Sequence, residues 1–161
     1  MKKLFLVRHA KSDWHNSAIK DIERPLNERG YSNANQMSEN LTEIPDLIIS
    51  SPAIRAISTA LIFARNIKYK ADHILIKEEL YEASVNNYLS VIHSLDDRYQ
   101  SVMLFAHNPT ISYVADYLLK NTLPMEMPTC TVAGIRFEEN QWKNIKSKKG
   151  ELFLFDFPKK N

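Results

Sequence analysis

The sequence predicts an α/β protein, a single-domain three-layer α/β/α sandwich in which helices cover both faces of a mostly parallel central sheet. Strand-like and helix-like stretches alternate along the chain. The strand-like stretches are short, continuous apolar runs, which suit strands that are buried on both faces. No internal repeat and no linker rich in Gly, Ser or Pro interrupts the sequence, so we expect one domain over residues 1–161.

The elements can be placed in order along the chain. Leu4–Val7 is the first apolar run. Asn27 is suited to cap a helix whose apolar residues recur to Leu41, before Pro45 ends it. The same patterns place strands at 4–7, 46–51, 73–80, 101–107, 130–137, 141–146 and 151–157, and helices at 27–41, 53–67, 85–95 and from Pro109 onward.

The composition narrows the possible partners. The formal net charge is +2, and Lys and Arg are scattered along the chain, whereas a nucleic-acid interface gathers basic residues on one element. No apolar run approaches the roughly 20 residues of a membrane helix. The run before Arg8 is too short for a signal peptide. We therefore expect a cytoplasmic monomer without nucleic-acid or membrane partners.

Cysteine and histidine usage gives no sign of a metal site. The single cysteine, Cys130, excludes an internal disulfide framework and a cysteine-based zinc site, and it fits a reducing compartment. His15, His73 and His93 match no metal-ligand spacing. We therefore expect neither a metal nor another cofactor.

Charged and polar side chains stand where three of the predicted strands end. Arg8 and His9 follow the first strand, Ser51 ends the second, and His107 ends the strand that precedes Pro109. In a doubly wound sheet the carboxyl ends of the strands meet at one edge, where ligands bind. We expect these three sequence-distant groups to lie together at that edge.

The residue types at this edge suit an anion. Arg55 lies in the first turn of the helix after the second strand, so its guanidinium and the helix N-terminus would join Arg8 there. Phosphate, sulfate or a carboxylate would satisfy the charge. Phosphate accounts best for His9 and His107, because a neutral imidazole can attack phosphorus and carry the phosphoryl group, while a second imidazole stabilises charge on its oxygens.

Five segments carry a resemblance to a known family. In order they are VRHAKSDW, RPLNERG, SSPAIRAISTA, LYEAS and FAHNPTIS. Together they resemble the histidine phosphatase superfamily, the phosphoglycerate-mutase-like proteins, over nearly the whole chain. The small size and the RPLNERG segment are most similar to the SixA-type phosphohistidine phosphatases.

The resemblance implies a role for each matching position. His9 would be the phosphorylated nucleophile, with Arg8, Arg55 and His107 around the phosphate. Glu82 stands where many members carry the acid that protonates the leaving group. Three further positions match residues near the phosphate less firmly, namely Ser12, Arg24 and Asn108.

Two positions depart from the family pattern. The usual first motif is Arg-His-Gly, but Ala10 follows His9 here, so this turn must use a conformation open to alanine or be strained. Mutase-like members have Asn directly after the Trp of the first motif. Here His15 follows Trp14 and Asn16 comes one residue later. The resemblance therefore does not imply for Asn16 the phosphate contact that this Asn makes in those members.

Several functions stay open. The first is a metal-independent phosphatase that forms phosphohistidine on His9 and acts on phosphohistidine in a protein, because the short chain leaves little for a lid over the site. The second is a small-molecule phosphomonoesterase in which Glu82 is the general acid. The third is a phosphate-recognition domain without catalysis. Mutase activity and a nucleotide-binding module are disfavoured, the latter because the chain has three glycines and no Gly-rich loop.

Overall fold

The computed structural model describes residues 1–159 and forms one six-stranded sheet in the order β3-β2-β4-β1-β5-β6. The strands are β1 (Lys2–Arg8), β2 (Leu47–Ser50), β3 (Leu75–Ile76), β4 (Ser101–Ala106), β5 (Val132–Phe137) and β6 (Glu151–Asp156). The helices are α1 (Glu28–Glu39), α2 (Ile54–Ile67), α3 (Val85–His93) and α4 (Thr110–Leu118). Short 3-10 turns lie at η1 (Asp21–Glu23), η2 (Ala71–His73), η3 (Glu78–Leu80) and η4 (Trp142–Asn144).

The sheet is mixed but mostly parallel. β1 pairs with β4, β4 with β2, and β2 with β3, all in parallel. β5 runs antiparallel to both β1 and β6. The predicted α/β class and the mostly parallel sheet are therefore confirmed.

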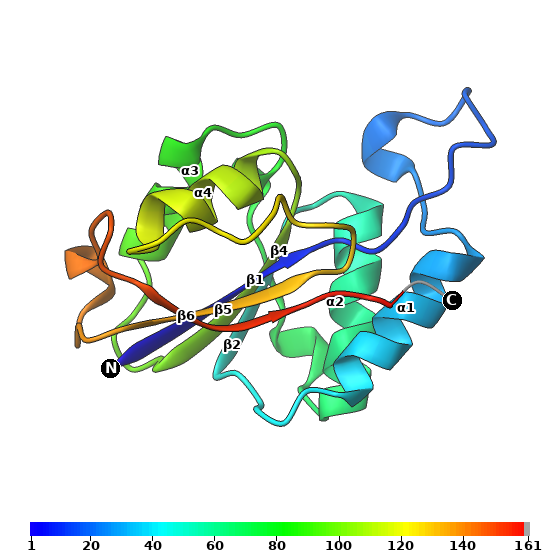
Figure 1. Cartoon of the computed structure of the whole chain (residues 1–161). Coiled ribbons are helices and arrows are strands. Elements are labelled where there is room, and N and C mark those ends of the chain that lie inside the picture. Colours follow the sequence, from blue (N-terminus) through cyan, green and yellow to red (C-terminus); the bar gives the residue numbers. More distant parts are fainter. Residues whose placement is uncertain (160–161) are drawn as a thin grey trace.

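The sheet is the middle of three layers (Figure 1). Helices α3 and α4 cover one face, and α1 and α2 cover the other. Strand β1 serves both faces, because Leu4 and Leu6 join one buried cluster while Phe5 and Val7 join the other. This alternation is the two-residue period of a strand with both faces buried.

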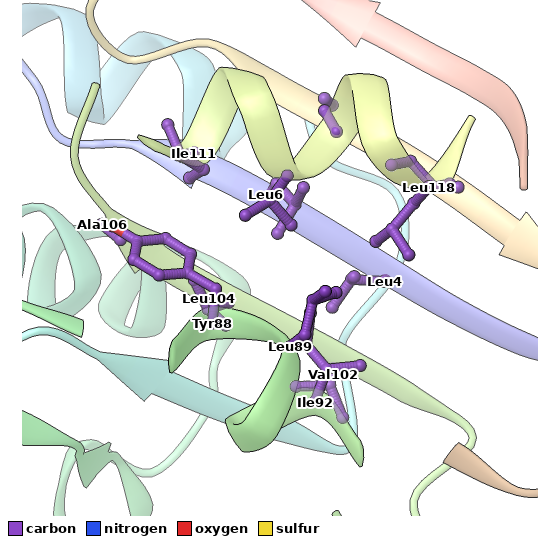
Figure 2. Packing of buried hydrophobic residues seen from close by; sticks show 14 of the residues in the cluster. Leu4, Leu6, Tyr88, Leu89, Ile92, Val102, Leu104, Ala106, Ile111 and Leu118 are labelled. Atoms are coloured by element: carbon purple, nitrogen blue, oxygen red, sulfur yellow. The ribbon is translucent and has the colours of Figure 1, made fainter. Parts of the chain in front are cut away.

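Figure 2 shows the cluster under α3 and α4. It gathers residues from α3, α4, β1 and β4, among them Tyr88, Leu89, Ile92, Ile111, Leu118, Leu4, Leu6, Val102 and Leu104. Packing on both faces holds β1 and β4 in register, with Leu6 opposite Leu104. The ends of these two strands are therefore held in a fixed position.

Two predicted strands differ from the structure. The 73–80 strand is reduced to β3, because 3-10 turns precede and follow its two residues. The 141–146 strand is wrong, since its central residues form η4. Trp142 and Ile145 are the buried residues there, and a spacing of three suits a 3-10 turn rather than the alternation of a strand.

The helix caps agree in part with the sequence. Asn27 caps α1 as predicted, because its side chain accepts a hydrogen bond from the Gly30 N–H at 2.8 Å. α3 begins with a capping box of Ser84 and Asn87, which was not predicted from the sequence.

Within residues 1–159, no helix has the length and apolar character to span a membrane.

Candidate active site

The sheet brings together the strand ends that carry the predicted site residues. The His9 N–H donates to the Ala106 carbonyl at 3.1 Å, which continues the pairing of β1 and β4 beyond their last residues. The Ser51 N–H donates to the Phe105 carbonyl at 3.0 Å in the same way. The rings of His9 and His107 consequently lie 5.3 Å apart between centroids.

His9 is held in one tautomer. Its Nδ1 lies 2.7 Å from the Ala10 carbonyl oxygen, which can only accept, so Nδ1 carries the proton and Nε2 has the free electron pair. Burial lowers the pKa of His9 to about 4, with further lowering from Arg55 and Arg8, while the bond to Ala10 opposes it. At neutral pH this imidazole is uncharged and able to act as a nucleophile.

His107 is hydrogen-bonded through its other ring nitrogen. Its Nε2 lies 2.7 Å from the Ser51 hydroxyl oxygen, which accepts the Ala53 N–H at 3.2 Å. This hydroxyl has one proton of its own to donate to Nε2, and with that bond the ring proton stays on Nδ1. Burial, followed by the charges of His9 and Arg55, lowers the pKa of His107 to about 3. His107 is a neutral N–H donor at this edge.

Two arginines of the predicted set lie beside these rings. Arg8 donates through Nη1 to the Met127 carbonyl at 2.8 Å. Arg55 is only 6% exposed and donates to Asp21, to the backbone carbonyl at 2.7 Å and to the carboxylate at 3.0 Å. Both guanidiniums disfavour a further positive charge on His9 and so lower its pKa.

Three buried donors at this edge have no partner. Within residues 1–159, the buried side-chain nitrogens and oxygens without a hydrogen bond are Arg8 Nε, Arg55 Nε and His107 Nδ1. Buried polar atoms are nearly always paired, so each such atom needs an explanation. All three are N–H donors on residues of one site, and an anion with several acceptor oxygens would satisfy them together.

Arg24 and Ser12 lie next to this group. Arg24 is 7% exposed, donates to the Ser12 hydroxyl and pairs with Asp21 at 2.7 Å. Its guanidinium also stacks on the Trp14 ring, 3.5 Å from the centroid. Arg24 contributes to the lowered pKa of both histidines, so its charge reaches the site.

Asn108 and Glu82 form no hydrogen bond with the other predicted site residues. The Asn108 amide donates to the Met127 carbonyl at 2.8 Å and accepts from the Ser112 hydroxyl at 2.6 Å, so it braces the connection that also holds Arg8. Glu82 is exposed, with a backbone φ of 50°. Its side chain makes no hydrogen bond or ion pair with any described residue.

Two residues of the site, Asp21 and Tyr81, were not predicted from the sequence. Asp21 joins Arg24, Arg55 and Tyr81, whose hydroxyl donates to it at 2.6 Å. Ser51 was expected at this edge, and the structure adds its contact with His107 Nε2. Asp21 lies three residues before Arg24, which is a recognisable ion-pair spacing, but nothing local connects either residue to Arg55.

The departures from the family pattern have a structural account. Ala10 is not among the described non-glycine residues with positive φ, and its side chain is fully buried. Its N–H donates to the Thr59 hydroxyl at 3.0 Å, so this turn is open to alanine without strain. Asn16 caps the Ala18 N–H within the exposed loop, and the His15 side chain is 94% exposed.

A six-stranded α/β sheet with paired histidines and arginines at the carboxyl end of β1 defines a class, the phosphatases of the histidine phosphatase type. A sequence model of the histidine phosphatase superfamily (branch 1) matches residues 4–89, more than half of the chain, and the chain belongs to this family.

Among the residues 1–159, no group of three or more His, Cys, Asp or Glu side chains is placed to hold a metal ion.

Solved structures resemble the chain over almost its whole length. A protein of Agrobacterium tumefaciens, assigned as the phosphohistidine phosphatase SixA, is 29% identical, with 98% of this chain and 99% of that chain covered and a TM-score of 0.81. The protein histidine phosphatase SixA complexed with tungstate is 19% identical, with 96% of each chain covered and a TM-score of 0.81. A mycobacterial glucosyl-3-phosphoglycerate phosphatase shares the fold at 16% identity, with coverages of 98% and 99% and a TM-score of 0.70.

One curated relative matches over a shorter region. An uncharacterized chloroplastic protein of Arabidopsis thaliana is 36% identical over 61 residues. That match takes in 36% of this chain but only 28% of the relative's own length.

Proposed function

We propose that this chain hydrolyses phosphohistidine carried by a protein and that it works through a covalent phosphohistidine on His9. The observation that carries the proposal is the arrangement around His9 Nε2. This bare nitrogen belongs to a ring that is neutral, and three unpaired donors of Arg8, Arg55 and His107 lie on its immediate neighbours.

The first step would transfer the phosphoryl group to the enzyme. His9 Nε2 attacks phosphorus while the bond from phosphorus to the leaving nitrogen breaks, and that bond's electron pair stays with the leaving imidazole. Arg8, Arg55 and the His107 N–H would hold the phosphoryl oxygens, because this transfer depends mainly on alignment and charge stabilisation. The His9 Nδ1 proton stays on the ring and remains bonded to the Ala10 carbonyl.

The second step would release phosphate. Water attacks phosphorus, the bond from phosphorus to Nε2 breaks, and its electrons return to His9. Both protons of the water leave with the product as dihydrogen phosphate, so the enzyme is restored with the same tautomer. No proton has to be stored on His107, which agrees with its lowered pKa of about 3.

The leaving group favours phosphohistidine over an ordinary ester. An imidazole protonated on its other nitrogen departs neutral, whereas an alkoxide needs a general acid. Glu82 is exposed and forms no hydrogen bond or ion pair with the described residues, which suits a substrate that needs no acid. The likeness to the Agrobacterium protein assigned as SixA, at 29% identity, supports the same substrate class.

A small-molecule phosphomonoesterase is the second candidate. Glu82 adjoins Tyr81, whose ring lies 5.7 Å from that of His107, so the loop that carries this carboxylate borders the site. In this alternative Glu82 would turn inward and protonate the leaving oxygen. A phosphate-recognition domain without turnover is the third.

The test compares hydrolysis of a phosphohistidine-bearing protein and of glycerol 3-phosphate, an alkyl monoester whose alkoxide leaving group needs an acid, with EDTA present throughout. We expect the phosphohistidine to be turned over, and His9→Ala to reduce turnover by about a thousandfold or more through loss of the nucleophile. Glu82→Gln should change it by less than about threefold. His15→Ala removes an exposed histidine and should leave turnover intact.

Other results would select the alternatives. Monoester turnover that exceeds phosphohistidine turnover and collapses in Glu82→Gln would make this a small-molecule phosphatase. Phosphate binding without turnover of either substrate would make it a recognition domain. Turnover that survives His9→Ala would contradict the covalent mechanism.

A further inference from the structure

We infer that Asp21 is a positioning residue for phosphate, which sets the orientation of Arg55 and Arg24 at the site. The inference rests on the proposed function, because it concerns the same anion. Asp21 belongs to η1, on the long connection between β1 and α1, and it was not among the residues predicted from sequence.

The carboxylate of Asp21 joins three side chains from different parts of the chain. Oδ1 accepts from Arg24 Nη2 at 2.7 Å, and Oδ2 accepts from Arg55 Nη2 at 3.0 Å and from the Tyr81 hydroxyl at 2.6 Å. These bonds, with Tyr81 the largest contribution and Arg24 the next, hold the pKa of Asp21 well below its usual range. The carboxylate is therefore ionised whenever the site is in use.

The backbone of Asp21 completes the arrangement. Its carbonyl accepts from Arg55 Nη1 at 2.7 Å, so one residue engages both terminal nitrogens of that guanidinium. The guanidinium is planar, and two bonds at its end fix its rotation. Arg55 Nε is then left as a buried donor without a partner. Asp21 thereby directs the Nε edge of Arg55 toward the anion.

Charge alone and positioning predict opposite effects of removing this carboxylate. Asp21 is a negative charge close to an anion site, so Coulomb repulsion should weaken phosphate binding, and its loss should tighten binding. If Asp21 instead fixes the two guanidiniums, its loss should weaken binding, because each arginine must then be ordered by the anion itself. Whether phosphate binds more tightly or more weakly without the carboxylate therefore distinguishes charge repulsion from positioning.

The experiment measures the dissociation constant of inorganic phosphate by titration calorimetry for the full chain. We expect Asp21→Asn to raise it about tenfold or more, which is the size of effect of a lost charged hydrogen bond. Asp21→Glu keeps the charge but moves the oxygens, and should also weaken binding. Asp13→Asn is the matched control, since Asp13 lies in the same connection and bonds to His15 instead, and it should change binding by less than about twofold.

A double-mutant cycle tests whether Asp21 acts through Arg55. In an Arg55→Ala background, Asp21→Asn should lose most of its effect, whereas a general structural defect would add to it. Circular dichroism checks that each variant is folded. Should Asp21→Asn not fold, Tyr81→Phe removes one of the bonds to Oδ2 and should raise the dissociation constant by about threefold.

The two possible failures are distinguishable. Unchanged or tighter phosphate binding by folded Asp21→Asn, with wild-type binding that still depends on Arg55, would overturn the inference and leave the proposed function intact. Wild-type protein that neither binds phosphate nor hydrolyses phosphohistidine would overturn the proposed function itself.

Discussion

The proton positions on His9 and His107 follow from single neighbouring oxygens. The Ala10 carbonyl holds the His9 proton on Nδ1, and the Ser51 hydroxyl leaves the His107 proton on its own Nδ1. Both rings carry the proton on Nδ1, but the nitrogen left unbonded differs. His9 therefore offers the electron pair of Nε2, and His107 offers its Nδ1–H. The division of roles that a phosphoryl transfer requires is set by the hydrogen-bond partners.

At the residue scale, His9 should stay neutral well into the acid range. Burial lowers its pKa to about 4, so at pH 5.5 the ring should be almost fully unprotonated, whereas a free histidine with a pKa of about 6.5 would be largely charged. Long-range 1H–15N NMR of the imidazole, assigned with His9→Gln, measures this directly. A midpoint near pH 6.5 would contradict the assigned environment.

The same shift has a consequence for stability. The unfolded chain would take up this proton near pH 6.5, and the folded chain only near pH 4. The contribution of neutral His9 to stability is therefore fully present above about pH 6.5 and is lost as the pH falls toward 4.

At the scale of elements, the start of α1 packs directly on the segment that leaves β1. The Asn27 N–H donates to the Lys11 carbonyl at 3.0 Å. A Cβ placed on Gly30 would come within 2.1 Å of the same carbonyl oxygen, so only glycine permits this approach. The contact secures the chain immediately before Ser12, which bonds to Arg24.

Gly30→Ala should consequently destabilise the protein by about 1–3 kcal/mol through overpacking against backbone. This reverses the usual gain of nearly 1 kcal/mol for alanine over glycine inside a helix. Phosphate binding should weaken as well. Urea unfolding measures the first effect and calorimetry the second. Ser32→Ala, at an exposed position of α1, is the control and should stay within about 0.5 kcal/mol of wild type.

At the scale of the whole molecule, the two ends of the sheet have different roles. The carboxyl ends of β1 and β4 carry the candidate active site. At the amino end of β1, Lys2 is fully buried, and its ammonium donates to the carbonyls of Asp97 at 2.6 Å and Tyr99 at 2.9 Å. The Trp142 indole donates to the same Tyr99 carbonyl at 2.8 Å, which ties η4 to this end.

Lys2→Met should lower the free energy of unfolding by about 2–3 kcal/mol, because two charged hydrogen bonds are lost while the apolar stem is kept. Phosphate affinity should not change, since this end lies opposite the site. Lys3→Met is the matched control at the next residue. Lys3 is partly exposed and pairs with Glu43 at 3.0 Å, so its loss should amount to less than about 1 kcal/mol. Equal losses in both variants would contradict the role given to Lys2.

Local pattern predicted most of the fold. Continuous apolar runs predicted β1, β2, β4 and β5. The residues that follow β1 and β4, His9 and His107, lie with their rings 5.3 Å apart, as expected from the strand ends. The exception at 141–146 is instructive, because Trp142 and Ile145 are buried three residues apart in a turn. A short segment with two apolar residues does not distinguish the two-residue period of a strand from the three-residue period of a 3-10 turn until its packing is known.

The sequence by itself determined the fold class and the residue types gathered at the carboxyl edge, because burial periodicity and strand ends are properties of consecutive residues. Only the tertiary structure decided what those side chains do. It assigned the Asn108 amide to the Met127 carbonyl, left Glu82 exposed and joined Asp21 to Arg55 across 34 positions. A hydrogen-bond partner is selected by position and direction in space, and residues so distant along the chain become neighbours only when the sheet and helices have packed.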